Sequence, residues 1–187
     1  MSLEKVVKRI QEIVGFYVDV EYDEFINPSF GTGNRIDDVL TDDELYHPMF
    51  EPVDFLTNEH LHIYHVMLPT KLKEDLRAFN YFKKTLSKKG LILSNFTDLS
   101  VFTILHELGH AYHLYVELKG NIEEYISTFY FENQSIDYQI KENGFDFEKI
   151  NDAHRLKATE IYADNYAIQH FEKVMSVLKQ EDMLGLL

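Results

Sequence analysis

Apolar residues recur every three or four positions over long stretches of this chain and alternate with polar residues over shorter ones. The first pattern is typical of helices with one buried face, and the second of half-buried strands. We therefore predict helices over residues 3–14, 71–89, 99–118, 122–141 and 152–178, and strands over residues 16–22 and 61–68. The segment between them, residues 27–59, is predicted to be mostly irregular because it holds helix- and strand-breaking residues, namely Pro28, Pro48, Pro52, Gly31 and Gly33.

The predicted strands lie in the N-terminal part of the chain and the helices gather towards its C-terminus, an order that is typical of the α+β class. A length of 187 residues fits one domain with a core of its own. We expect a single domain over residues 1–187, with a strand-containing part of about residues 1–95 and a helical part of about residues 96–187.

Composition narrows the possible chemistry. The chain has no cysteine, so any metal must be bound by histidine or carboxylate side chains. Its formal net charge of −14 opposes binding to nucleic acid or to anionic membranes, and no stretch approaches the roughly 18 apolar residues of a membrane span. The N-terminus alternates charged and apolar residues, unlike a signal peptide, so the cytoplasm is the expected location.

The predicted helix over residues 99–118 carries the sequence His-Glu-Leu-Gly-His. Residues four apart lie on one face of a helix, so the imidazoles of His106 and His110 can reach one cation. Glu107 lies about 100° round the helix, where it can act as a general base on water without binding the metal.

Gly109 is unusual in the middle of this predicted helix. A glycine there costs roughly 1 kcal/mol relative to alanine and needs an offsetting reason. We expect a second backbone to approach the helix closely at this position.

A catalytic zinc ion takes three protein ligands and leaves one position open. Glu160 is the preferred third ligand, because Asp164 follows one turn later and can take a hydrogen bond from a ligand histidine. Glu124 is the alternative. His113 and Glu117 are weaker candidates, since three ligands from one straight helix rarely close round a single ion.

The oxyanion that forms during peptide hydrolysis needs a hydrogen-bond donor near the metal. The candidates are Tyr64 and His65 on the predicted strand over residues 61–68, and Tyr162 and Tyr166 close to Glu160 in the sequence.

Two stretches around these candidates resemble known zinc peptidases. Residues 102–110, FTILHELGH, are similar to the F-T-x-x-H-E-x-G-H run of ImmA/IrrE-like proteases. Residues 160–164, EIYAD, are similar to the E-x-x-A-D helix of HtpX-type metalloproteases and of the ImmA/IrrE-like group. Both groups are gluzincins, in which a glutamate on a later helix completes H-E-x-x-H. Residues 106–113 and 127–129 also faintly resemble PepF-type oligopeptidases, which keeps Glu124 as an alternative.

The resemblance implies a helix-dominated zincin-like domain of the minigluzincin type, with one zinc ion per chain held by His106, His110 and Glu160. It also implies Glu107 as the base, Asp164 in support, and an extended peptide substrate along an edge strand, for which residues 61–68 are the candidate.

The residues and the resemblance together predict zinc-dependent hydrolysis of a peptide or protein substrate. Two alternatives stay open: a zincin-fold binding or regulatory protein without turnover, and a metal-free helical interaction domain.

Overall fold

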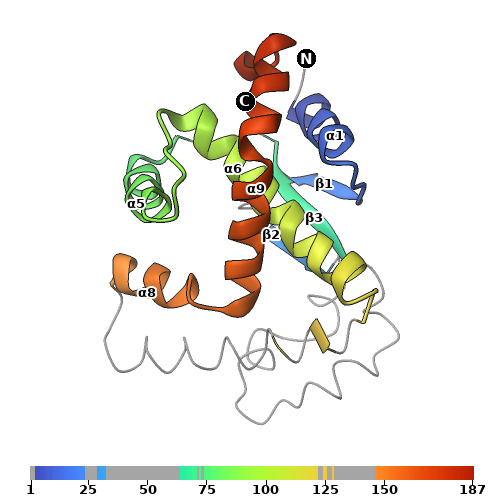
Figure 1. Ribbon diagram of the computed structural model, residues 1–187, viewed down its shortest axis with the longest axis vertical. Coiled ribbons are helices and arrows are strands. Elements are labelled where there is room, and N and C mark those ends of the chain that lie inside the picture. The colour runs from blue at the N-terminus through green and yellow to red at the C-terminus, as the bar shows by residue number, and fades with distance from the viewer. Residues whose placement is uncertain are drawn as a thin grey trace.

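The computed structural model describes residues 3–23, 29–32, 64–70, 72, 74–121, 124–125, 128 and 146–187 (Figure 1). Its elements are α1 (Leu3–Val14), β1 (Val20–Asp23), β2 (Ser29–Thr32), β3 (Tyr64–Pro69), α5 (Leu76–Ser87), α6 (Phe96–Tyr112), a π-helical turn (His113–Glu117), α8 (Phe147–His154), α9 (Ala158–Gln180) and a short 3-10 turn (Leu184–Leu186). Helices dominate beside one small sheet, so the predicted α+β class is confirmed.

The sheet has three strands in the order β1-β3-β2. β1 runs parallel to β3, with Val20 opposite Val66, and β2 runs antiparallel to β3, with Phe30 also opposite Val66. The strand that residues 61–68 were predicted to form is thus the central one, and the prediction that it is an edge strand is wrong. Within the described part of the chain the edges are β1 and β2.

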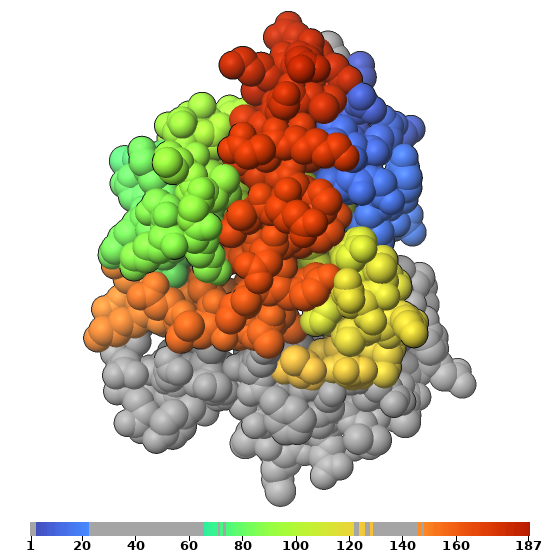
Figure 2. Space-filling model, viewed as in Figure 1, coloured from blue at the N-terminus to red at the C-terminus, as the bar shows by residue number. Residues whose placement is uncertain are grey.

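The core lies between the sheet and two long helices. α6 contacts α9, α5 and the strands β2 and β3, and α1 packs against α9. Leu105 and Leu108 of α6 and Ala163 and Ala167 of α9 are fully buried. In Figure 2, α9 lies at the surface between the green segments of α5 and α6 and the blue α1. α6 is therefore covered on several sides, which places its polar residues in the interior.

The helix starts follow from local capping. The carboxylate of Asp75 accepts hydrogen bonds from the backbone N–H groups of Arg77 and Ala78 at 2.9 and 3.0 Å, so α5 begins at Leu76 and not at residue 71 as predicted. Asn95 accepts from the N–H of Asp98 at 2.9 Å, so α6 begins at Phe96, three residues before the predicted start at residue 99. The prediction for α1 is confirmed at both ends.

The first predicted strand is shorter than expected. The backbone N–H of Val18 donates to the side chain of Gln11 at 2.8 Å, and that of Phe16 donates to the Gln11 carbonyl at 3.2 Å. These bonds tie residues 16–19 to the end of α1, so the strand begins only at Val20. β2 falls inside residues 27–59, so the prediction of a mostly irregular segment is wrong at this strand, and the remainder of that segment lies outside the described residues.

The prediction of one helix over residues 152–178 is wrong, because two helices meet there. α8 begins after Asp146, which caps the N–H groups of Glu148 and Lys149, and ends at His154. The backbone is extended at Lys157, with φ −62° and ψ 143°, and α9 starts at Ala158. Of the predicted helix over residues 122–141, residues 124, 125 and 128 are described and helical, and the rest lies outside.

None of the described helices combines the length and the apolar character needed to cross a bilayer.

Candidate metal centre

α6 places two histidines side by side in the interior. His106 and His110 are one turn apart, and their Nε2 atoms lie 3.1 Å from each other. Their rings are nearly perpendicular, with centroids 4.7 Å apart. Both side chains are buried, so water has little access to their ring nitrogens. The helical spacing therefore produces the shared face that the sequence predicted.

α9 adds a carboxylate to this pair. Glu160 Oε2 lies 3.2 Å from Nε2 of His106, and Glu160 Oε1 lies 3.3 Å from Nε2 of His110. Glu160 is buried like the histidines. Within the residues that the structure describes, His106, His110 and Glu160 form the group whose ligand atoms converge closely enough to hold a metal ion, all within 4.8 Å of one another.

The spacing of these donors fits a small cation. Zinc bonds to nitrogen and oxygen of about 2.0–2.2 Å at tetrahedral angles would place neighbouring donor atoms about 3.3–3.6 Å apart. The three contacts measured here, at 3.1, 3.2 and 3.3 Å, are close to that separation. When the histidines are neutral and protonated at Nδ1, both Nε2 atoms and the carboxylate are acceptors, and three converging acceptors are stabilised by a cation.

Asp164 lies behind His106 and meets partners from three segments of the chain. Its Oδ1 is 3.0 Å from Nδ1 of His106 and 2.5 Å from Nη1 of Arg155, and its Oδ2 accepts from Nζ of Lys89 at 2.8 Å. The contact expected between Asp164 and one of the two histidines is therefore present. An acceptor at Nδ1 keeps the proton on that nitrogen and leaves Nε2 of His106 free to bind a metal.

The ionisation of these groups follows from their contacts. Burial alone would lower the pKa of His106, but hydrogen bonds with Asp164 and Glu160 outweigh it and raise the pKa to about 9. Burial would raise the pKa of Glu160, yet hydrogen bonds from His106, His110 and His154 hold it far below its ordinary value. The pKa of Asp164 is also lowered, against the effect of burial, by His106 and Arg155. Both carboxylates are therefore anionic at neutral pH.

Two further side chains contact the histidines and their carboxylate. The hydroxyl of Tyr125 lies 3.4 Å from Nδ1 of His110. Nε2 of His154, whose side chain is 41% exposed, lies 3.0 Å from Glu160 Oε1. His154 is therefore partly exposed, whereas His106, His110 and Glu160 are buried.

Sequence reasoning did not predict Arg155, Lys89, His154 or Tyr125 at this site. His154 and Arg155 stand at the end of α8, just before the turn into α9. No local signal marks His154 and Arg155, because the apolar spacing continues across the break between α8 and α9 that places them here.

Glu107 is also on α6 and is buried. It adjoins His106 in the sequence and faces about 100° away from it round the helix. Its negative charge contributes to the raised pKa of His106, and it does not belong to the converging group.

Glu124, the alternative third ligand, is exposed and accepts a hydrogen bond from Nδ2 of Asn121 at 3.1 Å. It does not belong to the converging group of described residues. His113 stacks on Tyr162, with ring centroids 4.3 Å apart. The structure therefore brings Glu160, and not Glu124 or His113, to the two histidines.

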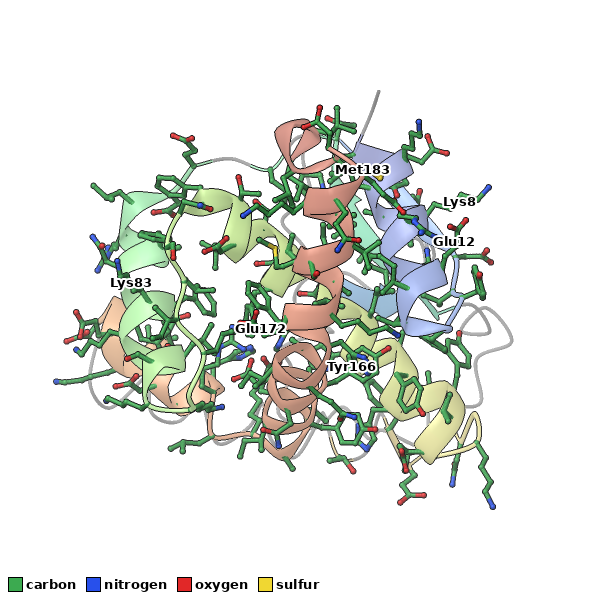
Figure 3. All side chains as sticks on the ribbon, turned by 45° about the horizontal axis from the view of Figure 1, so that its top comes forward. Lys8, Glu12, Lys83, Tyr166, Glu172 and Met183 are labelled. Atoms are coloured by element: carbon green, nitrogen blue, oxygen red, sulfur yellow. The ribbon has the colours of Figure 1, made fainter. Side chains whose placement is uncertain are left out.

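The candidate oxyanion donors fall into two sets. Tyr166 lies on the side of α9 that faces the end of α6, where its ring is 5.0 Å from that of Tyr112 (Figure 3). Tyr162 contacts His113 in the same region. The side chains of Tyr64 and His65 lie outside the described part of the structure, although their backbones belong to β3.

α6 and α9 approach each other closely at Gly109. A Cβ atom built at this position would lie 2.9 Å from Cα of Ala163, 3.0 Å from its carbonyl oxygen and 3.1 Å from Cβ of Tyr166. The expected close approach of a second backbone is confirmed. Because Ala163 lies between Glu160 and Asp164 in the sequence, this contact sets how near both carboxylates come to the histidines.

No protein-family model matches this chain, and comparisons with curated proteins and with solved structures find no significant match.

Proposed function

We propose that this protein is a zinc-dependent peptidase whose metal is held by His106, His110 and Glu160. The observation that carries the proposal is the convergence of two histidine nitrogens and one carboxylate, buried and 3.1–3.3 Å apart, from two helices. In the metal-free protein these groups hydrogen-bond one another, and a bound cation would replace those hydrogen bonds at the same three atoms.

The donor set favours zinc over other cations. Two histidines and one glutamate form a ligand set that occurs in catalytic zinc sites, whereas magnesium and calcium prefer oxygen donors alone. Three ligands leave a tetrahedral ion one position for water or substrate. A zinc ion bound there would act as a Lewis acid that acidifies water and polarises a peptide carbonyl.

The remaining steps belong to the side chains of the chain itself. Glu107 would accept the proton of the attacking water and pass it to the leaving amine, as the general base of the H-E-x-x-H motif. Asp164 would hold the proton of His106 on Nδ1, at 3.0 Å. His154, half-exposed beside Glu160, would border the entrance of the site.

An extended peptide is the substrate that best fits this arrangement. Among the described strands, β2 has a neighbour on one side only, and it contacts α6, which carries the histidines. An edge strand can pair with an added extended chain through backbone hydrogen bonds. We therefore assign to β2 the substrate-binding role that the family resemblance implied for residues 61–68.

Incubation with a peptide library tests the proposal. The zinc-loaded protein should cleave library peptides, and chelation followed by added zinc should abolish and then restore the cleavage. Glu107→Gln is the matched control, because it preserves both histidines and removes only the base. Zinc binding without any cleavage would instead favour a binding or regulatory protein.

A further inference from the structure

Arg155 reaches three groups of the proposed metal centre with a single nitrogen. Its Nη1 lies 2.5 Å from Asp164 Oδ1, 3.4 Å from Nδ1 of His106 and 3.5 Å from Glu160 Oε2. The guanidinium carbon lies 4.5 Å from the centre of the Phe82 ring of α5. With 15% of its side chain exposed, Arg155 is held between α5 and the two carboxylates of α9.

Arg155 and His106 share one acceptor. Nδ1 of His106 lies 3.0 Å from the same Oδ1 atom of Asp164 that Arg155 contacts. A guanidinium group can only donate hydrogen bonds, and so can an imidazole nitrogen that carries a proton. Asp164 Oδ1 therefore accepts from two donors that stand 3.4 Å apart and have no attraction for each other.

Metal binding requires one tautomer of His106. Its Nε2 faces Glu160 and His110, so this nitrogen must offer its lone pair and Nδ1 must carry the proton. If Asp164 were absent, the N–H of Arg155 would find an acceptor in an unprotonated Nδ1. That hydrogen bond would place the proton on Nε2 and block the metal-binding lone pair.

We propose that Arg155 is a positioning residue of this centre, and that Asp164 selects the metal-binding tautomer of His106 by drawing the Arg155 hydrogen bond away from Nδ1. Lys89, at 2.8 Å from Oδ2, anchors the other side of the carboxylate so that Oδ1 stays between the two donors. The inference rests on the proposed metal centre, and it adds a role for a residue outside the H-E-x-x-H motif.

A double-mutant cycle tests this role through the zinc dissociation constant, measured by competition with a chromophoric chelator. Asp164→Ala should weaken zinc binding about 100-fold, at the upper end of the range for groups that orient a ligand histidine. Arg155→Met, which keeps an apolar stem over Phe82, should weaken binding less than tenfold. The double variant should bind zinc about tenfold more tightly than Asp164→Ala alone, because the competing donor is gone.

A recovery of zinc affinity in the double variant distinguishes this role from a structural one. Loss of two packing groups would instead weaken zinc binding further. Lys149→Met removes a basic residue from exposed α8 and is the matched control: added to Asp164→Ala, it should give no recovery. Arg155→Leu provides a second variant, and thermal unfolding in chelator verifies that each protein folds.

Additive losses, or a double variant no better than Asp164→Ala, would overturn the role of Arg155 while leaving the metal centre intact. A wild-type protein that binds no zinc would reject the metal centre itself.

Discussion

Gly109 of α6 lies so close to Ala163 of α9 that an added Cβ atom would stand 2.9 Å from the Ala163 Cα. One helix carries both histidines of the proposed centre, and the other carries Glu160 and Asp164. The distance between the two backbones at this point therefore controls whether the three metal-binding groups can meet.

Gly109→Ala should destabilise the protein and weaken zinc binding together. The added methyl group forces the backbones of α6 and α9 apart, which typically costs about 1–3 kcal/mol of stability. The better helix propensity of alanine offsets about 1 kcal/mol of that cost. We expect a net loss of up to about 2 kcal/mol in the free energy of unfolding, measured with denaturant. Gly185→Ala is the matched control, because a Cβ there meets nothing within 4 Å. Equal effects of the two substitutions would contradict the close-approach argument.

Glu107→Gln should keep one equivalent of zinc and abolish peptide hydrolysis. Glutamine has nearly the shape of glutamate but cannot accept a proton from water, and His106, His110 and Glu160 all remain. Metal content by mass spectrometry and cleavage of a library-derived peptide provide the two readouts. Loss of zinc in this variant would mean that Glu107 is a ligand and not a base.

Glu160→Ala should lower zinc affinity by orders of magnitude, because it removes the anionic oxygen from a site with three protein ligands. Glu124→Ala should leave the affinity nearly unchanged, since Glu124 is exposed and bonded to Asn121. Both dissociation constants can be measured by chelator competition. The reverse order, with Glu124→Ala stripping the metal, would support the oligopeptidase-like alternative.

Zinc affinity should rise with pH up to about 9. The raised pKa of His106, about 9, means that this side chain carries an extra proton at neutral pH in the metal-free protein, and metal binding must release it. Below that pH the apparent affinity should increase about tenfold per pH unit for the one proton released, and it should level off above it. Calorimetry in buffers of different ionisation enthalpy counts the protons. Binding without proton release at pH 7 would contradict the pairing of His106 with Asp164 and Glu160.

Local signals were enough to predict the parts of the site that depend on helical spacing. His106 and His110 share a face because they are four residues apart, and the same spacing relates Glu160 to Asp164. The mid-helix Gly109 also signalled a close backbone contact that the structure contains. These features follow from the geometry of single helices, which a sequence pattern reports directly.

The features that were missed depend on contacts between distant segments. Strand order is decided by which strands pair in three dimensions, so the central place of β3 and the edge place of β2 had no local signal. The break between α8 and α9 was hidden because apolar spacing continues across it. Its turn holds Arg155 against Asp164, and such an ion pair can outweigh a modest helix propensity.

Diffraction from zinc-loaded crystals at wavelengths on either side of the zinc absorption edge tests the metal centre most directly. We expect one strong anomalous peak per chain, about 2.0–2.2 Å from Nε2 of His106, Nε2 of His110 and one carboxylate oxygen of Glu160. Glu107 should lie outside bonding distance of the peak. A peak elsewhere, or none at this cluster in crystals that contain zinc, would contradict the assignment of these three residues as the metal-binding site.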